Sequence, residues 1–238
     1  MNSVRIKVCG ITRTADAELA DELAVDAIGF VFVQKSKRFV SVEQAAEISA
    51  AVGPFMQRVG LFLDDEPALV EQALSRLPAL LLQFHGRESA SYCEQFNRPY
   101  IKAIGVAGGM PSEQELNTYE NCAGFLFDSN APGSLGGTGH TFDWAHLQGE
   151  KQNKNSADNL SRSRRLILAG GLNPDNIGSA VQQVKPYAVD VSTGVEVSPG
   201  IKDAKLMRDF VSNARNVTKA VTKAATASAT PKVAPDAP

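Results

Sequence analysis

The sequence has few cysteines, little net charge and no long hydrophobic run. Its three cysteines are an odd number at unrelated spacings, which argues against a disulfide framework or a metal-ligand pattern and favours a reducing cytoplasm. A net charge of −2 gives no footprint for nucleic acid or for an acidic membrane surface. No apolar run approaches the roughly 20 residues of a membrane helix, and the start lacks an apolar leader segment. We therefore expect a cytoplasmic protein that binds neither nucleic acid nor membranes.

The 238 residues, 43% of them apolar, alternate between two kinds of pattern. Short runs rich in β-branched and aromatic residues predict eight strands, near 4–9, 27–32, 58–63, 79–84, 100–105, 123–127, 165–169 and 188–192. Amphipathic or capped segments predict eight helices, near 14–24, 42–52, 67–77, 89–97, 112–120, 143–148, 174–184 and 203–214. Ser41 and Ser112 have capping-box spacing, and Asn173 before Pro174 is typical of a helix start.

Strict alternation of strands and helices predicts parallel strand pairing, because parallel strands need crossover connections. We expect one α/β domain, a (βα)8 TIM barrel over residues 1–215, with an open doubly wound sheet as the alternative. A polar insertion near 149–164 precedes the seventh strand. Residues 216–238, rich in Ala, Thr, Lys and Pro, form a tail that we expect to extend the last helix to about residue 225 and then to be partly disordered.

The period of two within a strand assigns side chains to the two faces of the sheet. In the sixth strand Phe125 and Phe127 face the helices, so Leu126 and Asp128 face the barrel axis. In the first strand the same alternation turns Cys9 toward the axis. Both Cys9 and Asp128 end their strands, so parallel pairing brings a thiol and a carboxyl group to one rim.

A thiol and a carboxyl group on one rim can share the work of a base and an acid. The alternative for Cys9 is a small buried hydrophobic residue, and the alternative for Asp128 is a loop cap. A thiolate base needs a positive neighbour, and Lys7 lies two residues before Cys9.

Two late loops have the glycines of an anion site. Gly170 and Gly171 follow the seventh strand, while Thr193 and Gly194 follow the eighth. Phosphate sites of barrel enzymes often use these two loops, where backbone N–H groups approach the ligand. The alternative is a pair of ordinary turns.

Further polar residues follow other strands. Arg38 follows the second strand and either grips a ligand carboxylate or lies on a solvated face. His85 ends the fourth strand and either lines the pocket or bonds a neighbouring loop. Asp190, in the eighth strand, either contacts substrate or pairs with Lys7 inside the barrel. The glycine-rich loop 129–139 is a candidate lid.

Together these residues resemble the phosphoribosylanthranilate isomerase family of tryptophan biosynthesis. The similarity covers roughly residues 4–214 and rests on the order of several motifs. These are Lys7-Val8-Cys9-Gly10-Ile11-Thr12, Gly29-Phe30-Val31-Phe32 with Ser36-Lys37-Arg38, Leu82-Gln83-Phe84-His85-Gly86, Gly136-Gly137-Thr138-Gly139 with Phe142-Asp143-Trp144, Leu168-Ala169-Gly170-Gly171-Leu172-Asn173-Pro174, and Val189-Asp190-Val191-Ser192-Thr193-Gly194-Val195-Glu196 with Pro199-Gly200 and Lys202-Asp203. Phe84 stands where leucine is commoner.

The resemblance implies an Amadori rearrangement of N-(5-phosphoribosyl)anthranilate by general acid/base catalysis, without metal or cofactor. It implies Cys9 as the base, Asp128 as the acid and Arg38 as the ligand of the anthranilate carboxylate. The late loops would hold the phosphate.

Three rivals are the histidine-pathway isomerase, which would use two aspartates, an indole-glycerol-phosphate synthase, which would need a catalytic lysine and more carboxylates, and a silent phosphate-binding scaffold. No long exposed apolar stripe is evident, so we expect a monomer.

Overall fold

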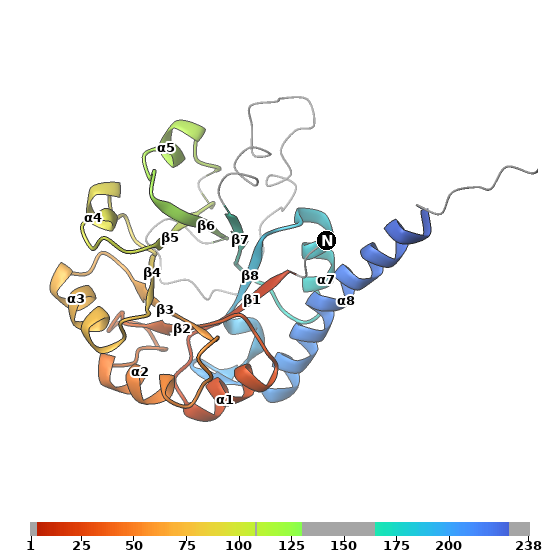
Figure 1. Ribbon diagram of the computed structural model, residues 1–238, viewed down its shortest axis with the longest axis horizontal. Helices are drawn as coiled ribbons and strands as arrows, with labels where there is room; N and C mark the ends of the chain where they lie inside the picture. Colours follow the sequence, from red (N-terminus) through yellow and green to blue (C-terminus); the bar gives the residue numbers. More distant parts are fainter. Residues whose placement is uncertain (1–3, 108, 130–164, 229–238) are drawn as a thin grey trace, which may run out of the picture.

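Eight parallel strands close into a barrel in chain order (Figure 1). The computed structural model describes residues 4–107, 109–129 and 165–228, with side chains up to Val217. The last strand, β8, pairs with the first, β1, which closes the sheet on itself. The predicted TIM barrel is therefore confirmed, and the alternative of an open sheet is excluded.

Each strand lies within two residues of its predicted ends. The strands are β1 (Arg5–Cys9), β2 (Ala27–Val31), β3 (Gln57–Phe62), β4 (Leu81–Phe84), β5 (Tyr100–Gly105), β6 (Cys122–Asp128), β7 (Arg165–Leu168) and β8 (Ala188–Val191). The agreement arises because apolar and β-branched runs mark strands that are buried on both faces.

The described helices surround the barrel (Figure 1). They are α1 (Thr14–Glu22), α2 (Val42–Ser49), α3 (Pro67–Arg76), α4 (Ala90–Glu94), α5 (Glu113–Asn117), α7 (Ile177–Val184) and α8 (Ala204–Ser228). Both predicted capping boxes are present, at Ser41 and at Ser112. The predicted start of α7 at Pro174 is wrong, because the helix begins at Ile177; Asn173 Oδ1 instead accepts the N–H groups of Asp175 and Asn176 in the preceding turn.

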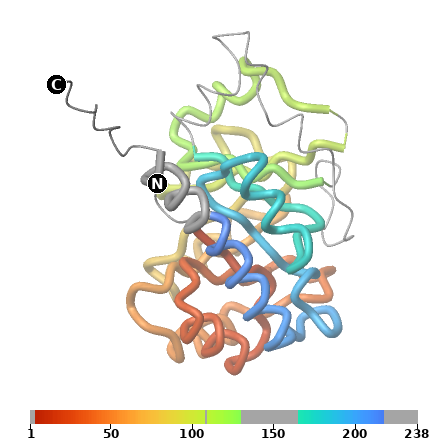
Figure 2. Tube along the Cα trace, turned by 90° about the vertical axis from the view of Figure 1, so that its right-hand side faces the viewer, coloured from red at the N-terminus to blue at the C-terminus, as the bar shows by residue number. Residues whose placement is uncertain are grey.

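An unpredicted hairpin lies between β8 and the last helix. The short 3-10 helix η2 (Thr193–Val195) leads into β9 (Glu196–Ser198), which pairs antiparallel with β10 (Ile201–Lys202). The helix α8 then returns to the start of the chain, where Arg215 donates to the carbonyl oxygens of Leu23 and Ala24. Figure 2 shows the first and last parts of the chain side by side. α8 continues to Ser228, close to the end predicted near residue 225.

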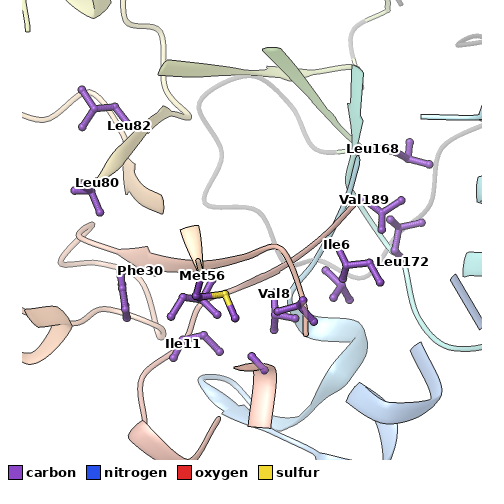
Figure 3. Close-up of a cluster of buried hydrophobic side chains, with 14 of the residues drawn as sticks. Ile6, Val8, Ile11, Phe30, Met56, Leu80, Leu82, Leu168, Leu172 and Val189 are labelled. Atoms are coloured by element: carbon purple, nitrogen blue, oxygen red, sulfur yellow. The ribbon is translucent and has the colours of Figure 1, made fainter. Parts of the chain in front are cut away.

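Two apolar layers confirm the predicted facing of the strands. Phe125 and Phe127 belong to the large cluster between the strands and the helices, part of which Figure 3 shows. Leu126 belongs to the smaller cluster inside the barrel. The smaller cluster consists of Ile101, Ala103, Leu126, Ile167, Ala169 and Ala188. The polar residues of the site stand above this inner layer, at the carboxyl ends of the strands.

Several predictions concern residues outside the described ranges. These are the helix at 143–148, the polar insertion at 149–164, nearly all of the candidate lid at 129–139, and the end of the tail from residue 229. Within the described part of the chain, no helix has both the length and the hydropathy needed to cross a bilayer.

Candidate active site

The two predicted catalytic side chains lie at the same end of the barrel. Cys9 is the last residue of β1 and Asp128 is the last residue of β6, and all strands of the barrel run in one direction. Both residues are buried, with 5% and 8% of their surface exposed. Active sites of this fold lie at the carboxyl ends of the strands. The thiol and the carboxyl group are therefore on the rim where the sequence predicts them.

A buried ion pair inside the barrel interacts with both of these groups. Lys7 Nζ is 2.8 Å from Asp190 Oδ1, and the two residues are register partners in β1 and β8. Lys7 also interacts with Cys9, through its charge and a hydrogen bond. Asp190 in turn feels the charge of Asp128. Of the two alternatives for Asp190, the structure shows the pairing with Lys7, and the pair connects the thiol electrostatically to the carboxyl group.

Burial and charge act against each other in this cluster. Burial alone would lower the pKa of Lys7, but Asp190 and Cys9 outweigh it and raise the pKa above its ordinary 10.5, so the amine is charged. Burial raises the pKa of Asp190, and Lys7 opposes this. Burial also raises the pKa of Cys9 above its ordinary 9.0, with Lys7 as the largest opposing influence. In this state the thiol is protonated at neutral pH, and formation of a thiolate depends on the cations around it.

His85 follows β4 and faces the same cluster. Burial lowers the pKa of its imidazole below the ordinary 6.5, although the charges of Asp128 and Asp190 oppose this, so the ring is neutral at neutral pH. Gln83 Nε2 lies 3.2 Å from His85 Nδ1. If the amide nitrogen donates this bond, the imidazole carries its proton on Nε2. His85 can then act as a neutral hydrogen-bond donor.

A second buried ion pair supports the loop that carries His85. Lys102 Nζ lies 2.9 Å from Glu88 Oε2 and donates to the carbonyl oxygen of Gly86 at 2.7 Å. Glu88 Oε1 accepts the N–H groups of Asp64 and Gly86. This pair was not predicted from the sequence, because Lys102 lies within an otherwise apolar strand and its outward direction gave no sign of a partner.

Arg38 is close to the site, but much of its guanidinium group is already bonded. Nε and Nη2 donate to the two carboxylate oxygens of Glu196, at 2.9 and 2.7 Å, and Nη2 also donates to Thr193 Oγ1. A Cβ atom placed on Gly10 would meet Arg38 Cδ and Ser192 Oγ, so Arg38 lies directly beside the end of β1. The carboxylate that Arg38 grips in this structure is that of Glu196, which the sequence analysis did not assign.

The two late loops pack against each other. Gly170 and Gly171 adopt positive φ angles of 85° and 64°, a conformation that favours glycine. A Cβ atom on Gly194 would overlap the carbonyl oxygen of Leu172, so only glycine fits between the loops. Thr193, the fourth residue predicted to hold phosphate, accepts a hydrogen bond from Arg38. The structure thus brings the predicted anion loops together and next to Arg38.

Side chains suited to proton transfer, buried in the mouth of a closed parallel barrel, are typical of (βα)8-barrel enzymes. Among the residues described, no three or more His, Cys, Asp or Glu side chains are grouped so that they could hold a metal ion.

Comparison with known proteins identifies the family. The model of the N-(5'-phosphoribosyl)anthranilate isomerase family matches residues 6–213. An N-(5'-phosphoribosyl)anthranilate isomerase of Stutzerimonas stutzeri is 46% identical over 217 residues, covering 91% of this chain and 100% of the relative. A relative of the same name from Stenotrophomonas maltophilia is 43% identical, with 89% and 93% covered. The chain therefore belongs to the phosphoribosylanthranilate isomerase family of tryptophan biosynthesis.

Solved structures agree with this assignment. The crystal structure of phosphoribosyl anthranilate isomerase from Thermotoga maritima is 38% identical and has a TM-score of 0.76, covering 90% of this chain and 99% of that one. A related crystal structure is a complex with reduced 1-(o-carboxyphenylamino)-1-deoxyribulose 5-phosphate, at 37% identity, a TM-score of 0.73 and the same coverage. Another, at 35% identity and a TM-score of 0.71, covers 89% of this chain and 98% of its own, and shows monomers generated from the dimeric Thermotoga maritima enzyme.

Proposed function

We propose that the isomerisation of N-(5-phosphoribosyl)anthranilate to 1-(2-carboxyphenylamino)-1-deoxyribulose 5-phosphate, which is the reaction of this chain, proceeds by general acid/base catalysis, with Asp128 as the acid and Cys9 as the base. The observation that carries the proposal is their placement. Both groups end strands of one barrel rim, and the Lys7–Asp190 ion pair interacts electrostatically with both. An acid and a base on one rim can act on the same bound sugar.

In the first step Asp128 gives its proton to the furanose ring oxygen. The bond between C1′ and the ring oxygen breaks, and the nitrogen lone pair forms the Schiff base. In the second step the thiolate of Cys9 removes the C2′ proton, and the electron pair of that bond gives the enolamine. The enolamine then tautomerises to the ketone. The charged Lys7 beside Cys9 stabilises the thiolate that this step needs.

Two anion anchors accompany this chemistry. Arg38 is our candidate for the anthranilate carboxylate, and the loops around Gly170 and Gly194 are our candidates for the phosphate. The hydroxyl groups of Ser129 and Ser192 support the phosphate site: both are buried and have no hydrogen-bond partner among the described residues. Gly170 lies against Ser129, so this hydroxyl is at the late loops. Phosphate oxygens would accept hydrogen bonds from both.

Loss of the fluorescence of phosphoribosylanthranilate measures the reaction. We expect Cys9→Ser and Asp128→Asn each to lower kcat by roughly 100-fold or more, with much smaller changes in KM, because each removes a proton transfer from the transition state. Cys93→Ala is the matched control, since Cys93 is also buried but lies in α4 outside the barrel. Turnover at the control rate in either variant would remove that residue from the mechanism.

The alternative functions call for different residues at the ends of the strands. A histidine-pathway isomerase would place an aspartate where Cys9 ends β1, and a silent scaffold has no reason to keep a thiol and a carboxyl group on one rim.

A cytoplasmic setting fits the three cysteines, none of which forms a disulfide. A monomer remains our prediction, although one similar enzyme is described as dimeric. Sedimentation velocity at several protein concentrations tests it, and a constant mass near 25.4 kDa is the expected result.

A further inference from the structure

The β9–β10 hairpin places two buried charged residues behind the site. Glu196 begins β9 and Lys202 ends β10, and their side chains are only 2% and 0% exposed. Lys202 Nζ lies 2.8 Å from Glu196 Oε1. Neither residue has a place in the proton transfers of the proposed mechanism. Burying two charges is costly unless they are paired and fully hydrogen-bonded, so their contacts are informative.

Glu196 fixes the orientation of Arg38. Its two oxygens accept Nε and Nη2 in a fork, which determines both the plane and the direction of the guanidinium group. Thr193 Oγ1 accepts a further hydrogen bond from Nη2. Nη1 is then the guanidinium nitrogen that donates to no group among the described residues. A substrate carboxylate would therefore approach the Nη1 side of Arg38.

Lys202 joins the ends of the first and last strands of the barrel. Its three ammonium hydrogens match three acceptors: the carbonyl oxygen of Cys9 at 2.6 Å, the carbonyl oxygen of Ser192 at 3.2 Å, and Glu196. Cys9 ends β1 and Ser192 follows β8. One side chain thus holds the backbone of the proposed base, the start of a proposed phosphate loop and the residue that orients Arg38.

The charges of the group are consistent with this arrangement. Burial alone would raise the pKa of Glu196, but Arg38 and Lys202 outweigh it and hold the pKa below its ordinary value of 4.5. Burial lowers the pKa of Lys202, and Glu196 only partly offsets this. Arg38 and Lys202 both contact the one carboxylate of Glu196, which gives this buried group its partners.

We propose that Glu196 and Lys202 are positioning residues for the isomerisation: Glu196 orients the guanidinium of Arg38 toward the anthranilate carboxylate, and Lys202 holds the backbone of Cys9 in place for proton abstraction. This inference rests on the proposed roles of Cys9 and Arg38. The two branches of the group affect different kinetic quantities, because one binds substrate and the other supports a chemical step.

The Cys9 branch is tested with Lys202→Met, which removes the charge and keeps the length of the side chain. The charged groups that act on the Cys9 thiol are Lys7 of its own strand, Asp190 of β8, Lys202 of β10 and Arg38 after β2. Lys202 lowers the pKa of Cys9, so its loss raises that pKa. We expect kcat to fall about 10-fold or more, and the pH at which kcat/KM reaches half its maximum to move upward by roughly half a unit or more.

Arg58→Met is the matched control for stability. Arg58 donates to the carbonyl oxygens of Ser49, Val52, Gly53 and Met56, near the start of β3 and thus at the opposite end of the barrel. Its loss removes hydrogen bonds between a cation and carbonyl groups without touching the site. We expect Arg58→Met to unfold at a lower temperature while keeping the wild-type pH midpoint. If Lys202→Met also keeps that midpoint and its kcat falls no further than that of Arg58→Met, Lys202 is only structural and the proposal fails.

The Arg38 branch is tested with Glu196→Gln in a double-mutant cycle. The amide can still accept on one side but presents N–H groups to Arg38 or Lys202, so the guanidinium loses its fork. We expect KM to rise about 10-fold while kcat changes much less, and we expect Glu196→Gln to have little further effect on KM in the Arg38→Ala background. An unchanged or lower KM would mean that Glu196 only neutralises Arg38, and would overturn its positioning role.

Cys9→Ser and Arg38→Ala, measured in the same series, distinguish failure of the proposed mechanism from failure of the positioning inference. If either keeps wild-type kinetics, the proposed role of that residue fails, and the positioning role built on it fails too. If both lose activity as expected while Lys202→Met and Glu196→Gln match the Arg58→Met control, the proposed mechanism stands and only the positioning inference is lost.

Discussion

Gly29 leaves the space that the sulfur of Cys9 occupies. The two residues are register partners in β2 and β1. A Cβ atom on Gly29 would lie 2.8 Å from Cys9 Sγ and 3.1 Å from Lys7 Cε, which is closer than carbon atoms normally approach such neighbours. Gly29 also accepts the N–H groups of Gly10 and Ile11 on its carbonyl oxygen. The thiol and the lysine can therefore face the axis together only because this neighbouring position has no side chain.

Gly29→Ala should displace the thiol or the lysine and lower kcat by about 10-fold or more, because a shift of about 1 Å in a catalytic group costs that much or more. The fluorescence assay measures the loss. Gly178→Ala is the matched control, since a Cβ there meets only Val217 Cγ2, at an ordinary 3.5 Å. Gly178 lies in α7, so alanine should also stabilise the helix by roughly 0.5–1 kcal/mol. Equal kcat in both variants would show that the space at Gly29 is not needed.

Arg38→Ala should raise KM for phosphoribosylanthranilate by about 10-fold or more, with a smaller effect on kcat, because it removes a charged ligand of the substrate. To identify the substrate group that Arg38 binds, we compare a reduced product analogue that has the carboxylate with one that lacks it. This analogue should bind the wild type and Arg38→Ala equally. If it discriminates between them as strongly as the carboxylated analogue does, Arg38 does not bind the carboxylate.

Gly194→Ala should weaken phosphate binding, because its Cβ would force the loop after β8 away from Leu172. We expect the dissociation constant of a phosphorylated product analogue to rise about 10-fold or more. Calorimetric titration with this analogue and with its dephosphorylated form provides the test. In the wild type the dephosphorylated form should bind far more weakly. Equal affinity of both forms for the wild type would contradict the phosphate site.

The group around Glu196 should contribute to stability in a pH-dependent way. The pKa of the Glu196 carboxyl group is lower in the folded protein than the ordinary 4.5. The stabilising effect of this carboxylate is therefore complete above pH 4.5 and is lost as the pH falls through the folded pKa. Urea unfolding of the wild type and of Glu196→Gln should therefore differ most near neutral pH. The difference should shrink in acid. A difference in unfolding free energy that stays constant into acid would contradict the direction of this shift.

Phe84 should matter for stability rather than for catalysis. Its buried ring lies between 5.7 and 6.2 Å, centroid to centroid, from the rings of Phe62, Tyr92, Phe96 and Tyr100. We expect Phe84→Leu to lower the free energy of unfolding by about 1–2 kcal/mol, through loss of ring contacts and imperfect repacking. Thermal unfolding checks this. A large fall in kcat would instead connect Phe84 to the neighbouring His85.

The strands and the facing of their side chains could be predicted from the sequence because both depend on local alternation. Cys9 and Asp128 end β-rich runs, so parallel pairing was enough to bring them to one rim. The α7 boundary was less predictable, because Asn173 caps a turn that precedes the helix rather than the helix itself.

The ion pairs of the site depend on contacts that no local pattern contains. Arg38 and Glu196 are 158 residues apart, and Lys202 lies 193 residues from the carbonyl group that it bonds at Cys9. The hairpin that carries Glu196 and Lys202 has strands of three and two residues, which are too short to show a period. The position of Arg38 could therefore be predicted, but its partner Glu196 could not.

The pairing of β1 with β8 also determines when, during synthesis, the chain can form its active site. The thiol of Cys9 is translated long before the groups that tune and anchor it, Asp190 and Lys202, and Lys202 follows it by 193 residues. A nascent chain that stops before β8 has the sulfur of Cys9 without Asp190 or Lys202, and one that stops before the hairpin still lacks Lys202. Chemistry thus waits until the hairpin has been made, and products truncated before Lys202 are expected to be inert.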